Sequence, residues 1–349
     1  MNNIEIIHGV GRTSIFVSSF RLYITNMYLQ LVKSKQVEFQ NQEEKDYMEF
    51  YLKLVGVHNQ SDHLNFPKFY DPHAYHFLNT PYAKKILSDT AYSLLLNPEK
   101  SEELEKFLNE ASLVEAWSAI FGLDNILDIG IRTKFIDDWV LENKHLKQLV
   151  IFGSGLDTRA LRLPLPSTMT IFEIDLPHVV EYKNNILSNI DVGKISKATR
   201  HSIFADLSES QWVSELESRG FNRDYPTLWL MEGIVMYLDP QSNSNLFKNI
   251  GLNSAEGSKV NVHTVGTMKM GISLKFEAEN PAAKRLGLKT FNWGMLNDEF
   301  GSKFDNPSEI LTEMGFNKNI KTFNGSEIAK ILGCSEIQNL LSEYTIGEK

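Results

Sequence analysis

The chain has 349 residues, of which 42% are hydrophobic and 23% charged, and its formal net charge is −9. This length and composition predict a soluble globular protein with one large α/β domain and an added helical part, and the scattered basic residues argue against nucleic acid or an anionic membrane as a partner. The one cysteine, Cys334, rules out an internal disulfide and a cysteine-based metal site, and the lack of a signal peptide and of an 18-residue apolar window predicts a cytoplasmic protein.

The N-terminal part of the chain is predicted to be helical. Apolar residues recur at helical spacing from Thr13 to Gln30, which predicts an amphipathic helix. Asp71-Pro72 marks the start of another helix, with proline in its first turn. His73 and His76 lie three residues apart on that helix, but no third metal ligand is evident. We therefore interpret both as surface or cap histidines and predict no metal site.

The middle of the chain alternates helices with strands. A helical apolar stripe runs from Ile131 to Val140, with Arg132 beside it, and the unbroken apolar run Leu149 to Phe152 is typical of a strand buried on both faces. Four more strands are predicted at residues 170–174, 199–204, 227–231 and 259–265. This alternation predicts a doubly wound, mostly parallel α/β sheet.

A glycine turn follows the first strand directly. Gly153 and Gly155 allow positive φ and leave room for a ligand against the backbone. Thr158 replaces the third glycine of a dinucleotide fingerprint. Asp157 would repel phosphate but suits a ligand with a positive charge, such as the amino group or sulfonium of S-adenosylmethionine. The turn therefore predicts a nucleoside site.

Carboxylates follow three of the strands. Asp175 ends the second strand about 20 residues beyond the glycines, where a carboxylate can take a ribose hydroxyl pair. Asp206 and Glu232 end the next two strands. Since ligands of open α/β sheets bind outside the carboxyl ends of the strands, these acids are predicted to converge on a cationic nucleoside. Taken singly, Asp206 could instead cap a helix, and Glu232 could be a helix-start acid.

Three longer segments are more specific than any single motif. FGSGLDTRALRL, FEIDLPHVVEYKNNIL and LWLMEGIVMYLDPQSNSNLFKNI together resemble the leucine carboxyl methyltransferase and polyketide O-methyltransferase family, a class I S-adenosylmethionine-dependent group. The resemblance runs from about Phe69 to Ile250. It implies a seven-stranded Rossmann-like methyltransferase sheet with an added helical cap, and S-adenosyl-L-methionine as cofactor.

The resemblance also implies roles for single residues. An arginine at the start of its helix grips the amino-acid carboxylate of the cofactor in this family, and Arg132 matches it; a surface pair with Asp128 or Asp137 is the alternative. An Asp-Leu pair that holds the adenine matches Asp206 and Leu207. The complete predicted cofactor site comprises Arg132, Gly153, Gly155, Asp157, Asp175, Asp206, Leu207 and Glu232.

We predict three regions: a helical cap region at 1–125, the S-adenosylmethionine-binding α/β core at 126–265, and a substrate-side insertion with the end of the sheet at 266–349. The last region is predicted to contain inserted helices after Val265, a helix near Asn306 to Met314, an extended piece near Phe316 to Phe323, and terminal helices. The cap is expected to fold over the carboxyl edge of the sheet, because methyl transfer gains from excluding water.

The predicted function is methyl transfer to a carboxyl or hydroxyl oxygen of a small molecule, of the kind found in secondary metabolism. Methylation of a protein's C-terminal leucine carboxylate is the first alternative. A nicotinamide-dependent oxidoreductase, which Thr158 and Asp157 count against, and a non-catalytic cofactor-binding protein remain as others. No catalytic base is evident, since Tyr237, His201 and His263 are candidates only by their place near the sheet edge. The sequence does not indicate an oligomeric state.

Overall fold

The computed structural model describes residues 11–33, 69–87, 123–190, 193–265, 306–334 and 342–349, with single residues between them. Seven strands form one sheet in the order β3-β2-β1-β4-β5-β7-β6. The strands are β1 (Gln148–Phe152), β2 (Thr170–Asp175), β3 (Thr199–Phe204), β4 (Thr227–Glu232), β5 (Lys259–Val265), β6 (Lys318–Asn324) and β7 (Ser342–Glu348). Strands β1 to β5 pair in parallel, and β7 is antiparallel to both β5 and β6. The predicted fold class is confirmed.

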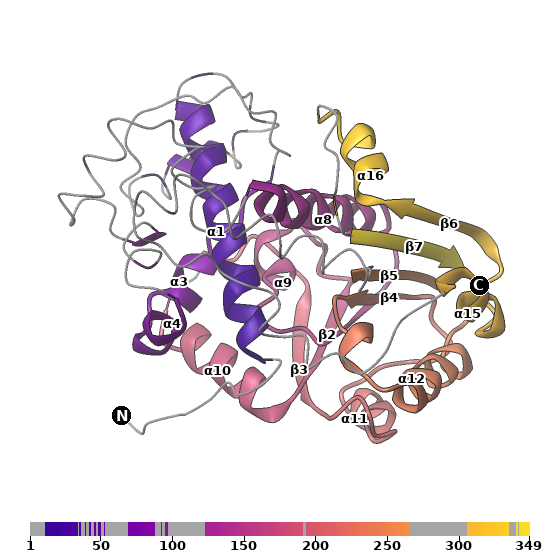
Figure 1. Ribbon diagram of the computed structural model, residues 1–349. Coiled ribbons are helices and arrows are strands. Elements are labelled where there is room, and N and C mark those ends of the chain that lie inside the picture. The colour runs from indigo at the N-terminus through magenta and orange to yellow at the C-terminus, as the bar shows by residue number, and fades with distance from the viewer. Residues whose placement is uncertain are drawn as a thin grey trace.

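The helices precede, connect and follow these strands (Figure 1). They are α1 (Gly11–Lys33), α3 (Ala74–Leu78), α4 (Pro81–Ile86), α8 (Leu123–Glu142), α9 (Arg159–Arg162), α10 (Pro177–Leu187), α11 (Trp212–Ser218), η2 (Val235–Tyr237), α12 (Pro240–Leu252), α15 (Pro307–Glu313) and α16 (Gly325–Ile331). Local signals set several starts. For example, Asp239 accepts hydrogen bonds from the N–H groups of Gln241 and Ser242, and Pro240 occupies the first turn of α12.

Two layers of helices cover the sheet. Helices α8 and α9 bury Ile136, Trp139 and Ala160 against one face, while α11, α12 and α15 bury residues such as Trp212 and Ile250 against the other. Every residue of β1 is buried, as the unbroken apolar run predicted. In Figure 1, α8 lies above strands β4 to β7, and α11 and α12 lie below them. This coverage leaves the carboxyl ends of the parallel strands as the place for a ligand.

The predicted helix from Thr13 to Gln30 is present as α1, but it is buried on more than one face. Every residue from 18 to 29 is buried, including polar ones. Several of these buried polar side chains have partners: Ser19 and Thr25 donate to backbone carbonyls of their own helix, and Arg21 pairs with Asp71. The helix packs against α8 and α3, so it belongs to the core and does not merely cover it.

The C-terminal segment differs most from its prediction. Residues 342–348 form β7 and not a terminal helix, and β7 lies between β5 and β6. Ser342, Tyr344 and Gly347 are buried because both neighbouring strands and the helices cover this strand. The predicted extended piece and the helix before it are confirmed as β6 and α15. The predicted insertion after Val265 lies outside the described residues.

Two smaller boundaries also change. Helix α3 begins at Ala74, so Pro72 precedes it instead of lying in its first turn. Arg132 lies in the middle of α8, because that helix begins at Leu123.

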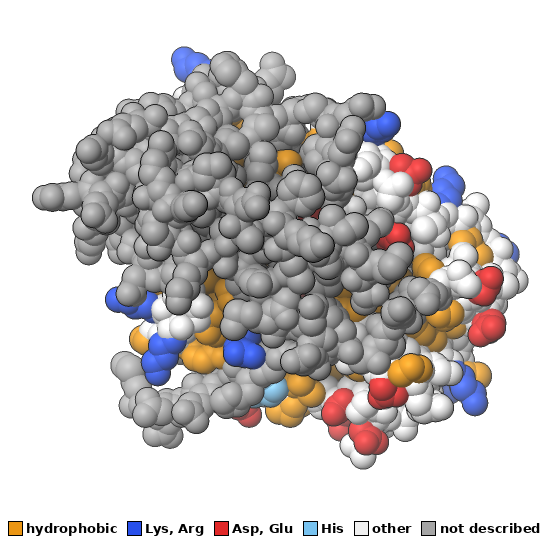
Figure 2. Space-filling view, viewed as in Figure 1, with side chains coloured by type: hydrophobic (Ala, Val, Ile, Leu, Met, Phe, Trp, Pro, Cys, Tyr) orange, Lys and Arg blue, Asp and Glu red, His pale blue; other side chains and the backbone are white. Residues whose placement is uncertain are grey.

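None of the described helices has the length and hydropathy that a membrane span requires. On the face shown in Figure 2, the described basic side chains lie at separate places and are not gathered in one patch.

Candidate functional site

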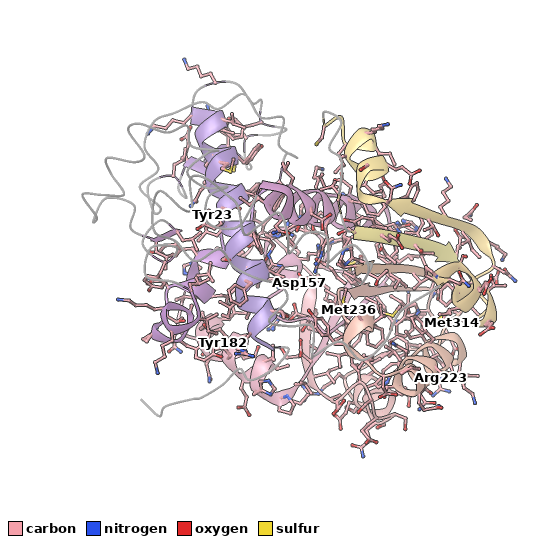
Figure 3. The ribbon with its side chains drawn as sticks, in the orientation of Figure 1. Tyr23, Asp157, Tyr182, Arg223, Met236 and Met314 are labelled. Carbon is pink, nitrogen blue, oxygen red and sulfur yellow. The ribbon has the colours of Figure 1, made fainter. Side chains whose placement is uncertain are left out.

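One pocket, of about 280 Å³, opens at the carboxyl ends of the parallel strands. It lies where the strand order reverses, with β2 on one side of β1 and β4 on the other, the usual ligand position in an open α/β sheet. All eight predicted cofactor residues line it: Arg132, Gly153, Gly155, Asp157, Asp175, Asp206, Leu207 and Glu232. Figure 3 shows Asp157 and Met236, which both line the pocket, near the centre of the molecule.

The glycine turn is closed by Asp175. The N–H of Gly155 donates to Asp175 Oδ2 at 2.6 Å, and the N–H of Leu176 donates to Oδ1 at 2.7 Å. Burial raises the pKa of Asp175, although these two backbone donors act in the opposite direction. The carboxylate thus lies beside the turn with a fixed orientation, and each oxygen keeps a further lone pair for a ligand.

The glycines are required by the protein itself. Gly153 and Gly155 have φ of +59° and +46°, as predicted. A Cβ on Gly153 would lie 2.8 Å from Ile234 Cδ1, and one on Gly155 would lie 3.1 Å from Ser14 Cβ. Helix α1 therefore packs directly on the turn. The positive φ predicted for Gly155 is present, and the side chain that would meet a Cβ on this residue is Ser14 of α1.

A buried arginine joins three carboxylates beneath the pocket. Arg159 Nε donates to Asp137 at 2.8 Å, and its Nη1 contacts Asp157 and Glu232, each at 2.5 Å. Only 1% of the Arg159 side chain is exposed. Burial alone would raise the pKa of Glu232, but Arg159 and Arg132 outweigh burial and hold that pKa well below its usual range. Glu232 is therefore ionised.

The network gives two predicted acids partners within the protein. Asp157 and Glu232 are predicted to supply negative charge to a cationic ligand, and arginines pair with both. The backbone N–H of Arg159 donates to Asp157 Oδ1, and its guanidinium contacts Oδ2. Sequence reasoning missed Arg159 altogether. The available signal was the physical requirement that several acids at a buried edge need cations of comparable number.

Arg132, which lines the pocket, pairs with Glu232. Its Nε donates to Glu232 Oε1 at 2.6 Å, so neither Asp128 nor Asp137 is its partner. Within the described part of the chain, this is the one hydrogen bond that Arg132 makes. Its two terminal nitrogens are thus available to a ligand in the pocket that Arg132 lines. A planar fork of this kind suits a carboxylate.

Asp206 and Leu207 differ in exposure at the end of β3. Asp206 Oδ1 accepts from the N–H and the hydroxyl of Ser208 at 2.9 and 2.7 Å, which closes a local turn. Asp206 does not cap the following helix, because α11 begins at Trp212 and its N-cap residue is Gln211. Leu207 is buried. Because both also line the pocket, the turn presents one polar and one apolar group to it.

The base candidates occupy different places. Tyr237 lines the pocket, whereas His263 is fully buried and His201 stacks on Phe172 away from it. His73 is buried and not a surface residue, and burial lowers its pKa to about 4. Its ring centre lies 6.4 Å from that of His76. No group of three metal-ligating side chains occurs in the described part of the chain.

Known proteins match the chain over the region that forms this pocket. The profile of the leucine carboxyl methyltransferase family matches residues 70–251. Two relatives are named "Putative S-adenosyl-L-methionine-dependent methyltransferase". One, from Mycobacterium avium strain 104, is 42% identical over 134 residues, or 38% of this chain and 43% of the relative. The other, from Mycobacterium ulcerans strain Agy99, is 34% identical over 185 residues, or 52% and 58%.

The chain thus spans about half the length of these curated relatives. Among solved structures, a "putative methyltransferase" from Thermobifida fusca YX overlaps with a TM-score of 0.44 and 15% identity, covering 71% of this chain and 89% of that one. The family profile covers more than half of this chain, including β1 to β4 and the glycine turn. The chain belongs to the leucine carboxyl methyltransferase family of class I S-adenosylmethionine-dependent methyltransferases.

Proposed function

We propose that the protein binds S-adenosylmethionine in this pocket and transfers its methyl group to a carboxyl or hydroxyl oxygen of a small molecule. The observation that carries the proposal is the arrangement of Asp175 and Arg132. One is a carboxylate fixed at the glycine turn, and the other is a guanidinium with two nitrogens available to the pocket. The two ends of a zwitterionic nucleoside need these opposite groups.

The residues fit this cofactor along its length. Asp175 would accept from the ribose hydroxyls, Arg132 would hold the amino-acid carboxylate, and Asp206 with Leu207 would border the adenine. The pocket volume, about 280 Å³, lies near the lower end of small-molecule sites, roughly 300–1,000 Å³. Gly153 and Gly155 adopt the positive φ of this turn and carry no side chain beside the pocket that they line.

The arginine network would keep the cofactor half of the pocket rigid. Glu232 stays ionised between Arg132 and Arg159, so it orients the Arg132 guanidinium through a 2.6 Å hydrogen bond. Asp157 is fixed by the same Arg159. A guanidinium with a fixed orientation loses less entropy when it binds a carboxylate, which favours affinity.

S-adenosylmethionine supplies an activated methyl group when bound, so the chain's own residues have mainly to position the acceptor and exclude water. Positioning of two reactants can contribute roughly 7–11 kcal/mol to a lowered barrier. Ser14, Val17 and Arg21 of α1 line the pocket, and Arg21 donates to the carbonyl of Leu156 at 2.6 Å. We propose that α1 acts as part of the predicted cap over the cofactor.

Thr158 weighs against the nicotinamide alternative. It occupies the place of the third glycine, is buried, and accepts a hydrogen bond from Arg162 Nε at 2.9 Å. The close packing that a glycine provides under a pyrophosphate is therefore replaced by a side chain. The other alternative, methylation of a protein's C-terminal carboxylate, would use the same cofactor site, and only the methyl acceptor would differ.

Calorimetry on the full chain tests the proposal. We expect S-adenosylmethionine and S-adenosylhomocysteine to bind with micromolar dissociation constants or tighter, and NAD to show no heat of binding. Arg132→Met should weaken S-adenosylhomocysteine about tenfold or more, because a charge-assisted pair is lost. Arg223→Met, at an exposed arginine, is the matched control. Binding of NAD but not of S-adenosylhomocysteine would overturn the proposal.

A further inference from the structure

A third glycine of the pocket wall, Gly233, lies directly against the Arg132 guanidinium. A Cβ built on Gly233 would lie 3.1 Å from Arg132 Nη2 and 3.5 Å from both Cζ and Nη1. The shortest of these distances is below an ordinary van der Waals contact, so the guanidinium would have to move by a few tenths of an ångström. Gly233 and Arg132 both line the pocket. A side chain at position 233 would therefore enter space that Arg132 uses.

The backbone on each side of this contact is fixed by secondary structure. Gly233 directly follows β4, has φ of +69°, and donates its N–H to the carbonyl of His263 at 3.2 Å. His263 lies on β5, as the register partner of Glu232. Arg132 lies in the middle of the 20-residue helix α8. The part that can shift is therefore the end of the Arg132 side chain.

Glu232 and Gly233 meet different parts of the guanidinium. Glu232 Oε1 accepts from Arg132 Nε at 2.6 Å, whereas Gly233 faces the terminal nitrogens Nη1 and Nη2. These two nitrogens are the donors that the proposed function assigns to the cofactor carboxylate. Two consecutive residues after the same strand thus set where Nη1 and Nη2 meet a ligand.

The surroundings make this position important for binding. The side chains of Arg132 and Glu232 are only 11% and 8% exposed. A hydrogen bond weakens as its distance and angle depart from their preferred values, and in a site with little water it contributes more than at the surface. A small displacement of the guanidinium should therefore lower the affinity for a carboxylate. The fold should lose less, because the displaced group is the end of a flexible side chain.

We propose that Gly233 is a positioning residue for the cofactor, and that its missing side chain lets Arg132 distinguish S-adenosylmethionine from the decarboxylated form of this molecule. The inference rests on the proposed function and adds a residue that determines its specificity. The decarboxylated form keeps the adenosine, the sulfonium and the amino group, so it loses only the contact with Arg132. The backbone after β4 thereby selects a cofactor that carries a carboxylate.

Calorimetry on the full chain tests this selection with two probes, S-adenosylhomocysteine and decarboxylated S-adenosylhomocysteine, which lacks only the carboxylate. The wild-type protein should bind the decarboxylated probe at least about tenfold more weakly, since a charge-assisted pair is missing. Gly233→Ala should weaken S-adenosylhomocysteine by about threefold to tenfold, because that pair is distorted and not lost. It should change the affinity for the decarboxylated probe by about twofold at most, a difference that a purely structural role would not produce.

Arg132→Met removes the group that Gly233 is proposed to position. In this background, Gly233→Ala should change the affinity for S-adenosylhomocysteine by about twofold at most, because residues in contact have non-additive effects. Gly333→Ala is the control for backbone strain, since its φ is +71° and nothing lies within 4 Å of the added Cβ. It should lower the melting temperature about as much as Gly233→Ala does, and leave both affinities unchanged.

Gly233→Asn is a second variant for the case that alanine is not tolerated. Asparagine adopts positive φ more readily than alanine does, and it carries the same Cβ. We therefore expect a smaller loss of melting temperature than in Gly233→Ala. The loss of affinity for S-adenosylhomocysteine should be at least as large.

Three results would overturn the inference: an unchanged affinity for S-adenosylhomocysteine in either folded variant, an equal loss for both probes, or additive losses in the Arg132→Met background. Failure of both variants to fold would also overturn it, because glycine would then serve the fold and not the cofactor. Each of these results, with S-adenosylhomocysteine bound by the wild type, leaves the proposed function intact. Failure of S-adenosylhomocysteine to bind the wild-type protein would reject the proposed function, and the inference with it.

Discussion

The two sides of the pocket hold their carboxylates in different ways. On the glycine side, backbone N–H groups of Gly155 and Leu176 hold Asp175. These two donors lie 20 positions and one position from Asp175 in the sequence. On the other side, side chains hold Glu232. Arg159 and Arg132, its two partners, lie 73 and 100 positions away in the sequence.

The difference concerns charge balance. The glycine side needs no counter-ion, because neutral backbone donors satisfy Asp175. The other side buries three acids and three arginines: Asp137, Asp157, Glu232, Arg132, Arg159 and Arg162. Loss of one partner from a buried ionic network leaves an uncompensated charge, which costs more than loss of one hydrogen bond. Stability should thus depend more on the arginine side, and ligand binding on both.

The largest effect should come from Arg159→Met. This change leaves Asp137, Asp157 and Glu232 without their shared cation, and we expect the free energy of unfolding to fall by about 3–5 kcal/mol. Urea denaturation followed by circular dichroism measures it. Arg223→Met, which breaks the exposed pair with Glu217, should leave the unfolding midpoint unchanged. A loss at Arg159 no greater than at Arg223 would mean that the network does not stabilise the fold.

Asp175→Ala should mainly affect the ligand. It removes the proposed ribose acceptor, so the affinity for S-adenosylhomocysteine should fall by about 1.5–3 kcal/mol, or roughly tenfold to more than a hundredfold. Calorimetry measures this change. Because burial raises the pKa of Asp175 above the ordinary 3.8, affinity in the wild type should be full at neutral pH and fall as the pH drops through that raised value.

Asp175→Asn supplies the control for this pH dependence. An amide cannot titrate, so the variant should bind weakly but with an affinity that does not change over the same acid range. If the wild-type affinity stays constant down to the ordinary carboxyl pKa, or if Asp175→Ala binds like the wild type, Asp175 is not the ribose contact.

Gly155→Ala should have an intermediate effect on stability. The residue has φ of +46°, and its new Cβ would approach Ser14 Cβ to 3.1 Å, so we expect a loss of about 1–2 kcal/mol. Gly333→Ala is the control, because its φ is +71° but nothing lies within 4 Å of the added Cβ. Adding Ser14→Gly to Gly155→Ala should recover the steric part of the loss. No recovery would mean that α1 does not restrict the turn.

The smallest effect should come from Asp138→Asn, at a residue that does not line the pocket. Asp138 and Lys134 pair one turn apart on the outer part of α8, and 35% of the Asp138 side chain is exposed. Such a pair contributes about 0.5 kcal/mol or less. Thermal unfolding should therefore show a shift near the detection limit. A loss comparable to that in Arg159→Met would remove the distinction between buried and surface pairs.

The sequence by itself determined the parts that depend on neighbouring residues. The all-apolar run at 149–152 predicted a buried strand, and the glycines after it predicted a turn with positive φ. The parallel order also brought the strand-end acids Asp175, Asp206 and Glu232 to one pocket. These inferences succeed because burial of a strand and the conformation of a turn leave periodic or local signals.

Only the tertiary structure decided which charges meet. Arg132 had Asp128 and Asp137 as candidate partners, but packing of α8 against the sheet brings it to Glu232 instead. Arg159 as the shared cation of three acids had no local signal. The place of β7 between β5 and β6 brings Ser342 within hydrogen-bond distance of Asp128, 214 positions away in the sequence. A long side chain can reach many partners, so its choice depends on how distant segments pack, which no local pattern records.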